Sequence, residues 1–150
     1  MESPGHRVAA RRLAALLLIG SLVGCQNVGD VLPPEQMKLG ALNATSKELV
    51  LVVNGERIDD LHPGVPLELS AARLPPLQWT AEVRLPDGRS LFSLTVRAGD
   101  VATTRHADGS IEQRGDGARV DLSCGRIDLW SGPPLIGPAP GPGAPGDCDP

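Results

Sequence analysis

The sequence predicts an all-β fold: a small antiparallel β-sandwich, immunoglobulin-like or closed into a small barrel. Short apolar or alternating segments recur about every ten residues, and Asn, Asp, Pro and Gly turn residues separate them. No segment beyond the first 25 residues has the 3.6-residue apolar period of a helix. We assign this pattern to one domain over residues 41–130, about 90 residues, which suffices for a modest core.

We interpret residues 1–24 as a signal peptide whose apolar segment is helical. Basic residues come first and the uncharged run 13–25 follows, which is the order of a secretion signal. The basic residues are His6, Arg7, Arg11 and Arg12. The run has about a dozen residues, fewer than the roughly 20 that a helix needs to cross ~30 Å of hydrocarbon. We therefore expect export without a permanent transmembrane helix.

The apolar run ends in Leu22, Val23, Gly24 and Cys25, which resemble the lipobox of bacterial lipoprotein precursors. The resemblance implies that a signal peptidase recognises the first three residues, cuts before Cys25, and leaves a diacylglyceryl group on its thiol. Two or more acyl chains anchor a protein stably, because each buried methylene contributes about 0.8 kcal/mol and one chain binds only marginally. The alternatives are a plain signal peptide with a chance cysteine, and twin-arginine export through Arg11-Arg12.

We interpret residues 25–40 as the lipidated cysteine followed by a tether. They lack strand alternation and contain Pro33-Pro34. A flexible coil of about 15 residues reaches on the order of 20 Å. We therefore expect the domain to lie close to the membrane surface.

The first predicted strands form a hairpin. Residues 48–53 are apolar and β-branched, and Asn54-Gly55 is the strongest short-range signal for a tight hairpin turn. Residues 56–61 return from this turn. A second turn at 62–64 precedes a strand over 66–70.

The clearest strand runs from 77 to 85, because apolar and polar residues alternate along it. The turn 86–88 contains Pro, Asp and Gly, and a strand over 89–96 follows. We expect one buried face made of Leu77, Trp79, Ala81, Val83, Leu85, Phe92, Leu94 and Val96. Weaker strands are predicted at 101–104, 110–114, 118–124 and 126–130.

The C-terminal segment 131–150 contains seven prolines and five glycines, a composition that cannot build a core. If Cys25 carries lipid, Cys124 and Cys148 remain as one pair in an oxidising compartment, so we predict a disulfide between them. Two thiols that bind metal or react are the alternative.

The predicted disulfide would fold the tail back over the end of the domain. We expect Leu135, Ile136 and Trp130 to cover an edge strand there. A polyproline ligand for an aromatic groove is the alternative function of this tail.

Charge argues against nucleic acid as a partner. Residues 25–150 carry 17 acidic and 11 basic residues, which leaves a net charge of −6. This balance also argues against a polybasic contact with anionic lipid.

We identify no catalytic, cofactor or metal motif. The sequence lacks a Gly-x-Ser-x-Gly elbow, a Cys-x-x-Cys pair and an Asp-x-Asp-x-Asp-Gly calcium loop. His62 and His106 are expected in turns or loops, and the acidic residues are expected on a solvated surface. Trp79 and Phe92 fall on the core face, so Trp130 is the one ring left for a sugar, and a single ring is a poor platform.

Residues 53–64 and 121–130 resemble segments of small all-β domains in exported bacterial lipoproteins. We therefore expect a non-enzymatic lipoprotein anchored to the cell membrane or outer membrane, with its domain outside the cytoplasm. Its sandwich would bind an envelope protein or serve a structural role. A carrier of a small or lipophilic ligand is the second hypothesis. An envelope hydrolase, which would need His62, His106 and a carboxylate in one cleft, is the third.

Overall fold

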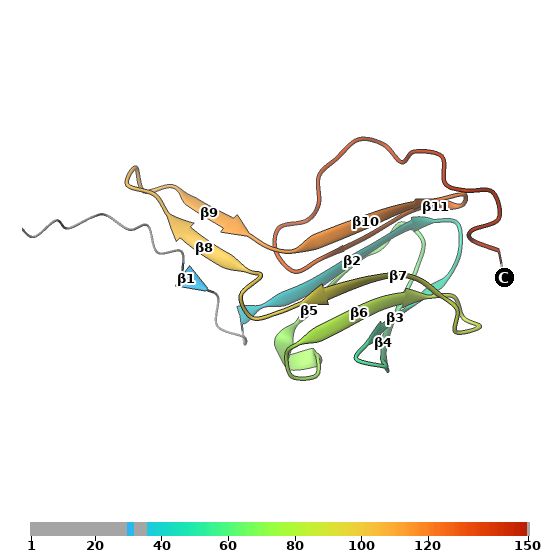
Figure 1. The fold of residues 1–150 in the computed structure, drawn as a ribbon, viewed down its shortest axis with the longest axis horizontal. Coiled ribbons are helices and arrows are strands. Elements are labelled where there is room, and N and C mark those ends of the chain that lie inside the picture. The colour runs from blue at the N-terminus through green and yellow to red at the C-terminus, as the bar shows by residue number, and fades with distance from the viewer. Residues whose placement is uncertain (1–29, 32–35, 150) are drawn as a thin grey trace, which may run out of the picture.

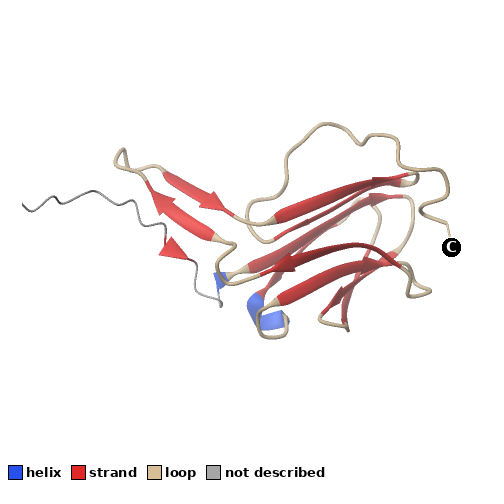
Figure 2. Cartoon of the chain, viewed as in Figure 1, coloured by secondary structure: helices blue, strands red, loops and turns tan. Residues whose placement is uncertain are grey.

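The computed structural model describes residues 30–31 and 36–149, and it is all-β, as predicted. Two four-stranded antiparallel sheets pack face to face, and a smaller three-stranded sheet extends from one end (Figures 1 and 2). The expected signal peptide, the lipobox and most of the expected tether lie outside the described residues. Among the described residues, no helix has the length and apolar character needed to cross a membrane.

The strands pair antiparallel throughout. The first sheet has the order β10 (Gly117–Leu122), β11 (Gly125–Trp130), β2 (Lys38–Thr45) and β5 (Pro66–Ser70). The second has the order β4 (Glu56–Leu61), β3 (Leu49–Val53), β6 (Trp79–Arg84) and β7 (Ser90–Val96). The third has the order β1 (Asp30–Val31), β8 (Ala102–Arg105) and β9 (Ile111–Arg114).

Local turn chemistry explains the two predicted hairpins. Asn54 and Gly55 join β3 to β4, and both have positive φ, at 52° and 85°. Gly88, with φ of 95°, lies in the turn between β6 and β7. These are the conformations for which Asn and Gly carry little steric cost.

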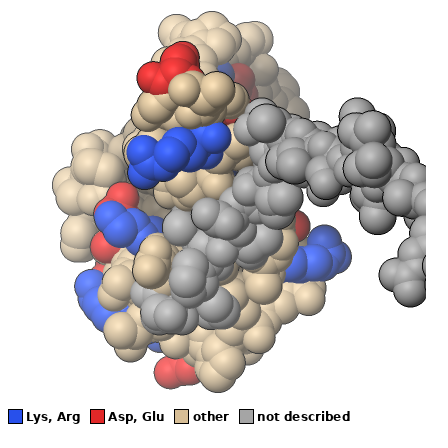
Figure 3. Space-filling view, turned by 90° about the vertical axis from the view of Figure 1, so that its left-hand side faces the viewer, with Lys and Arg blue, Asp and Glu red and all other residues tan. Residues whose placement is uncertain are grey.

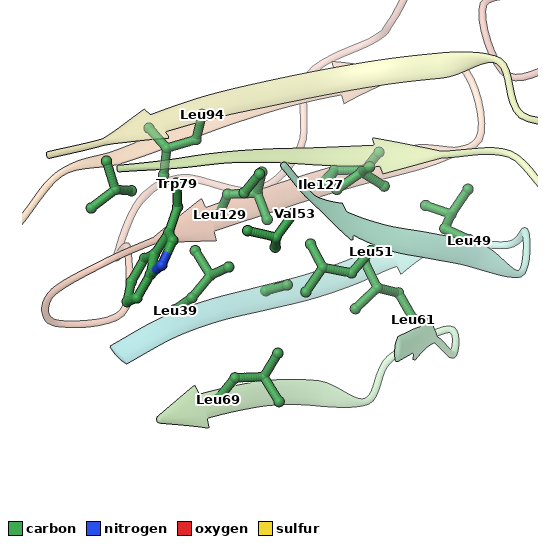
Figure 4. Close-up of a cluster of buried hydrophobic side chains, with 14 of the residues drawn as sticks. Leu39, Leu49, Leu51, Val53, Leu61, Leu69, Trp79, Leu94, Ile127 and Leu129 are labelled. Carbon is green, nitrogen blue, oxygen red and sulfur yellow. The ribbon is translucent and has the colours of Figure 1, made fainter. Parts of the chain in front are cut away.

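The core lies between the two large sheets (Figure 4). The alternation predicted for residues 77–85 is confirmed, because Trp79, Ala81 and Val83 are fully buried. Leu77 and Phe92 are only half-buried at its margin. The first sheet contributes residues that include Leu39, Leu69, Ile127 and Leu129.

The prediction of a tether over residues 25–40 is wrong in two places: Asp30–Val31 form β1, which pairs with β8, and the last residues belong to the sandwich. Lys38 opens β2, which is a central strand between β11 and β5. Met37 and Leu39 are buried core residues, so the folded unit begins before Ala41. β2 contains Gly, Ala and Asn, which have low strand propensity, so its residues do not show a strand pattern. Pairing with its two neighbouring strands stabilises it instead.

The C-terminal residues 131–149, named the strap below, run across the outer face of the first sheet (Figure 1). The predicted disulfide between Cys124 and Cys148 is confirmed, with the two Cα atoms 6.0 Å apart. Leu135 packs over the backbone of Gly117 on the edge strand β10, as expected. Ile136 is 97% exposed, so the prediction that it covers this edge is wrong.

Candidate functional site

An apolar groove opens at the rim of the sandwich, where the chain passes from β5 to β6. Its volume is about 460 Å³. A short 3₁₀ turn (Ala71–Arg73) and the segment that follows it form its walls. The lining includes Ala71, Leu74, Pro75, Pro76, Leu77 and Trp79.

Trp79 holds the wall of the groove in place. It opens β6 and is fully buried, and its indole Nε1 donates a hydrogen bond of 2.8 Å to the backbone oxygen of Pro75. A buried indole needs such a partner. The rings of Pro75 and Pro76 restrict the backbone further. The groove is therefore preformed, with a rigid apolar wall.

The groove lies beside the start of β2. The backbone N–H of Ala71 donates to the backbone oxygen of Met37, at 3.1 Å. Cys25 is 12 residues before Met37, and 12 extended residues span at most ~40 Å. An anchor on Cys25 would therefore hold this end of the sandwich within reach of a membrane surface.

Basic and acidic side chains are interspersed on this end of the molecule (Figure 3). Lys38 and Glu68, for example, pair across β2 and β5 at 2.6 Å, and both are exposed. An exposed pair of this kind contributes little to stability. The part of this end that Figure 3 shows therefore presents a surface of mixed charge.

A polar cluster around Arg126 and Asp121 connects the strap to the first sheet. The guanidinium of Arg126 donates to both carboxylate oxygens of Asp121, at 2.5 and 3.0 Å. It also donates to the backbone oxygens of Pro138 and Ala139. The N–H of Gly141 donates to Asp121 Oδ2 at 2.9 Å. One ion pair thus carries three hydrogen bonds to the strap.

The pKa values of the two aspartates in this cluster shift in opposite directions. The hydrogen bond from Arg126, and then that from Gly141, lower the pKa of Asp121 to about 2. Burial raises the pKa of Asp128, against the opposing charges of Arg119 and Arg126. Arg119 Nε lies 3.3 Å from Asp128 Oδ1, but no hydrogen bond within the described part of the chain reaches that oxygen. The cluster has the character of a structural clamp.

The expectation that the ring of Trp130 is left free at the surface is wrong. Its side chain is 7% exposed and packs on Gly40, its register partner on β2. The strap begins at the next residue, Ser131, which is also buried. The ring therefore contributes to packing.

The structure does not bring His62 and His106 together. His62 lies in the turn after β4, and the neighbouring Gly64 binds the backbone of Asn43 near the end of β2. His106 lies in the β8–β9 turn, at the opposite end of the molecule (Figure 1). Each contacts its own exposed glutamate: His62 with Glu48 at 2.7 Å, and His106 with Glu112 at 3.2 Å.

Over residues 36–149, no three His, Cys, Asp or Glu side chains gather in a way that could hold a metal ion. The turn aspartates instead bind nearby backbone or hydroxyl groups. Asp108, for example, accepts hydrogen bonds from the N–H and the hydroxyl of Ser110, and these lower its pKa. This is ordinary turn chemistry.

The chain matches no protein-family model, no curated protein and no solved structure.

Sequence reasoning missed the groove. It placed Trp79 in the core, which is correct, and Leu77 on the same buried face, but it assigned no role to Leu74, Pro75 and Pro76 before them. The available signal in the sequence was the proline pair with a leucine on either side, Leu74 and Leu77. That they line one groove depends on the Trp79 to Pro75 hydrogen bond and on the contact with Met37, which join residues distant in sequence.

Proposed function

We propose that this chain is a non-enzymatic cell-envelope lipoprotein, anchored by a diacylglyceryl group on Cys25, and that its sandwich binds a partner protein through the apolar groove. The anchor rests on the lipobox resemblance of Leu22, Val23, Gly24 and Cys25. The observation that carries the binding role is the groove itself, an apolar and preformed recess of about 460 Å³.

A protein segment with apolar side chains suits this groove. The recess opens at the surface of the domain, and its walls offer alkyl groups from Leu74, Leu77 and the two prolines. Apolar side chains that enter it would be removed from water, which contributes about 25 cal/mol per Å² of buried apolar surface. Because the walls are rigid, binding would order little of the domain itself.

A lipophilic carrier is the second candidate. The space between the sheets is filled by core side chains such as Leu39, Leu51 and Val53, all 0% exposed. A carried ligand would therefore occupy the same groove, whose volume falls in the range of roughly 300 to 1,000 Å³ that small-molecule sites have.

The first experiment places a photo-crosslinking amino acid at Leu77, in the full chain in its native envelope. The matched control carries it at Glu56, an exposed residue in β4. We expect a protein adduct from position 77 and none from position 56. Equal adducts from both positions would contradict binding at the groove, and an adduct of small mass at position 77 would favour the carrier.

The anchor is tested separately by the intact mass of the membrane-extracted protein, before and after reduction. We expect a chain that begins at Cys25, carries added acyl mass, and gains two hydrogens when its disulfide is reduced. A chain without lipid would refute the anchor while leaving the groove to be tested alone.

A further inference from the structure

The arm, residues 102–114, consists of β8, β9 and their turn, and projects from the sandwich (Figure 1). In the three-stranded sheet, β8 has a neighbour on each side, whereas β9 is the terminal strand. All four residues of β9 are exposed. In the part of the chain that the structure describes, no strand pairs with the outer edge of β9.

The hydrogen-bond pattern determines which groups this edge presents. His106 N donates to Ser110 O at 2.9 Å, so this pair is bonded across the hairpin. Bonded and non-bonded pairs alternate along an antiparallel ladder. The backbone groups of Glu112, opposite Thr104, therefore face β8. Those of Ile111 and Gln113 face away from it, toward the outer edge.

We propose that the outer edge of β9 pairs antiparallel with β9 of a second copy of this chain, about a two-fold axis at Gln113. Gln113 would then lie opposite Gln113 of the second copy, in a hydrogen-bonded pair. Glu112 of each copy would lie opposite Arg114 of the other. The join would merge two three-stranded sheets into one of six strands.

Charge selects this register from the others that the backbone allows. Glu112 and Arg114 have opposite signs and stand two residues apart, so they share one face of β9. Only an axis at Gln113 places each opposite its counterpart, and opposite charges directly across antiparallel strands are stabilising. Glu112 also contacts His106 of its own arm through Oε2 at 3.2 Å, which leaves Oε1 available to face the arginine.

Charged residues on an edge strand usually prevent pairing with another chain. On β9 the charges should likewise repel any partner strand that does not place opposite charges across from Glu112 and Arg114. A second copy of β9 does place opposite charges there. The join involves short strands and buries less than the roughly 1,200 Å² of a standard stable interface. We therefore expect a weak dimer with a dissociation constant no higher than about 1 mM.

The test is sedimentation of the full chain, in a detergent whose density matches the solvent. The single variants Glu112→Arg and Arg114→Glu each place like charges opposite one another twice, and should raise the dimer dissociation constant about tenfold or more. The double variant Glu112→Arg/Arg114→Glu restores the opposite pairs, and should dimerise like the wild type.

Gln113→Pro supplies a backbone test of the same join. Proline removes the N–H that points outward and leaves the β8-facing bonds of Glu112 in place, so the arm should persist while the dimer is lost. Circular dichroism and the unfolding midpoint verify the fold of each variant. A wild type that stays monomeric to about 1 mM would overturn the proposal. So would a dimer that persists in both single variants, which would indicate association through a shared micelle or another face.

Discussion

The indole of Trp130 lies directly over the backbone of Gly40, its register partner across β11 and β2. A Cβ atom at Gly40 would lie 2.1 Å from Cε2 of the indole. The aromatic ring thus fills the space that a side chain on the central strand would occupy.

Gly40→Ala should therefore force the indole out of its site. We expect the free energy of unfolding to fall by about 1 to 3 kcal/mol, the usual cost of overpacking. Urea denaturation followed by tryptophan fluorescence measures this loss. The control is Gly99→Ala, because a Cβ at Gly99 meets nothing within 4 Å and its φ is not in the positive range. Equal stability of the two variants would contradict this packing.

Asp121→Asn should change how stability depends on acid pH. The pKa of Asp121 is about 2 in the folded protein, while an aspartate in an unfolded chain titrates near ~3.9. Between these values the unfolded chain holds more protons, so stability falls as the pH drops from about 4 to 2. The stabilisation from the ionised carboxylate is fully present above about pH 4.

The asparagine variant lacks this titration, so its stability should be lower at neutral pH and should decline less between pH 4 and 2. Urea unfolding at several pH values gives both slopes. Parallel slopes for the variant and the wild type would show that the Arg126 to Asp121 pair contributes nothing to the acid response.

Removal of the disulfide should release the strap. A bridge that closes a loop of about 25 residues stabilises by roughly 3 kcal/mol in the chain-entropy model. Cys124→Ser/Cys148→Ser should lose a comparable free energy of unfolding. Hydrogen exchange should also become faster at Gly141, whose N–H binds Asp121. Unchanged exchange there would mean that the Arg126 and Asp121 clamp holds the strap without the disulfide.

Asn43 should be among the most sensitive polar positions. It is fully buried, and its amide donates to the backbone oxygens of Leu61 and Lys47, at 2.7 and 2.8 Å. Its Oδ1 accepts from the N–H and the hydroxyl of Thr45, at 3.0 and 2.6 Å. Asn43→Ala removes all four bonds and should cost about 2 to 4 kcal/mol.

Thr45→Val is the matched comparison in this network, because it removes the hydroxyl and keeps the side-chain volume close. It should cost less than Asn43→Ala in the same urea titration. The reverse order would show that the threonine, not the asparagine, joins the end of β2 to the β3–β4 hairpin.

The elements that can be predicted from the sequence alone are those whose information is local. Asn54-Gly55 specifies the β3–β4 hairpin, and the alternation around Trp79 specifies the buried face of β6, because turn conformation and side-chain period depend on neighbouring residues. The pairing of Cys124 with Cys148 followed from the cysteine count, on the premise that Cys25 carries lipid.

Features that join distant segments depend instead on the tertiary structure. β2 is a strand because β11 and β5 pair with it on both sides, although Gly40 and Asn43 have low strand propensity. Trp130 is buried because Gly40 makes room for it, and the groove exists because Trp79 and Met37 hold the segment between β5 and β6. Each of these contacts depends on how sheets and loops meet in space, which no local pattern of residues encodes.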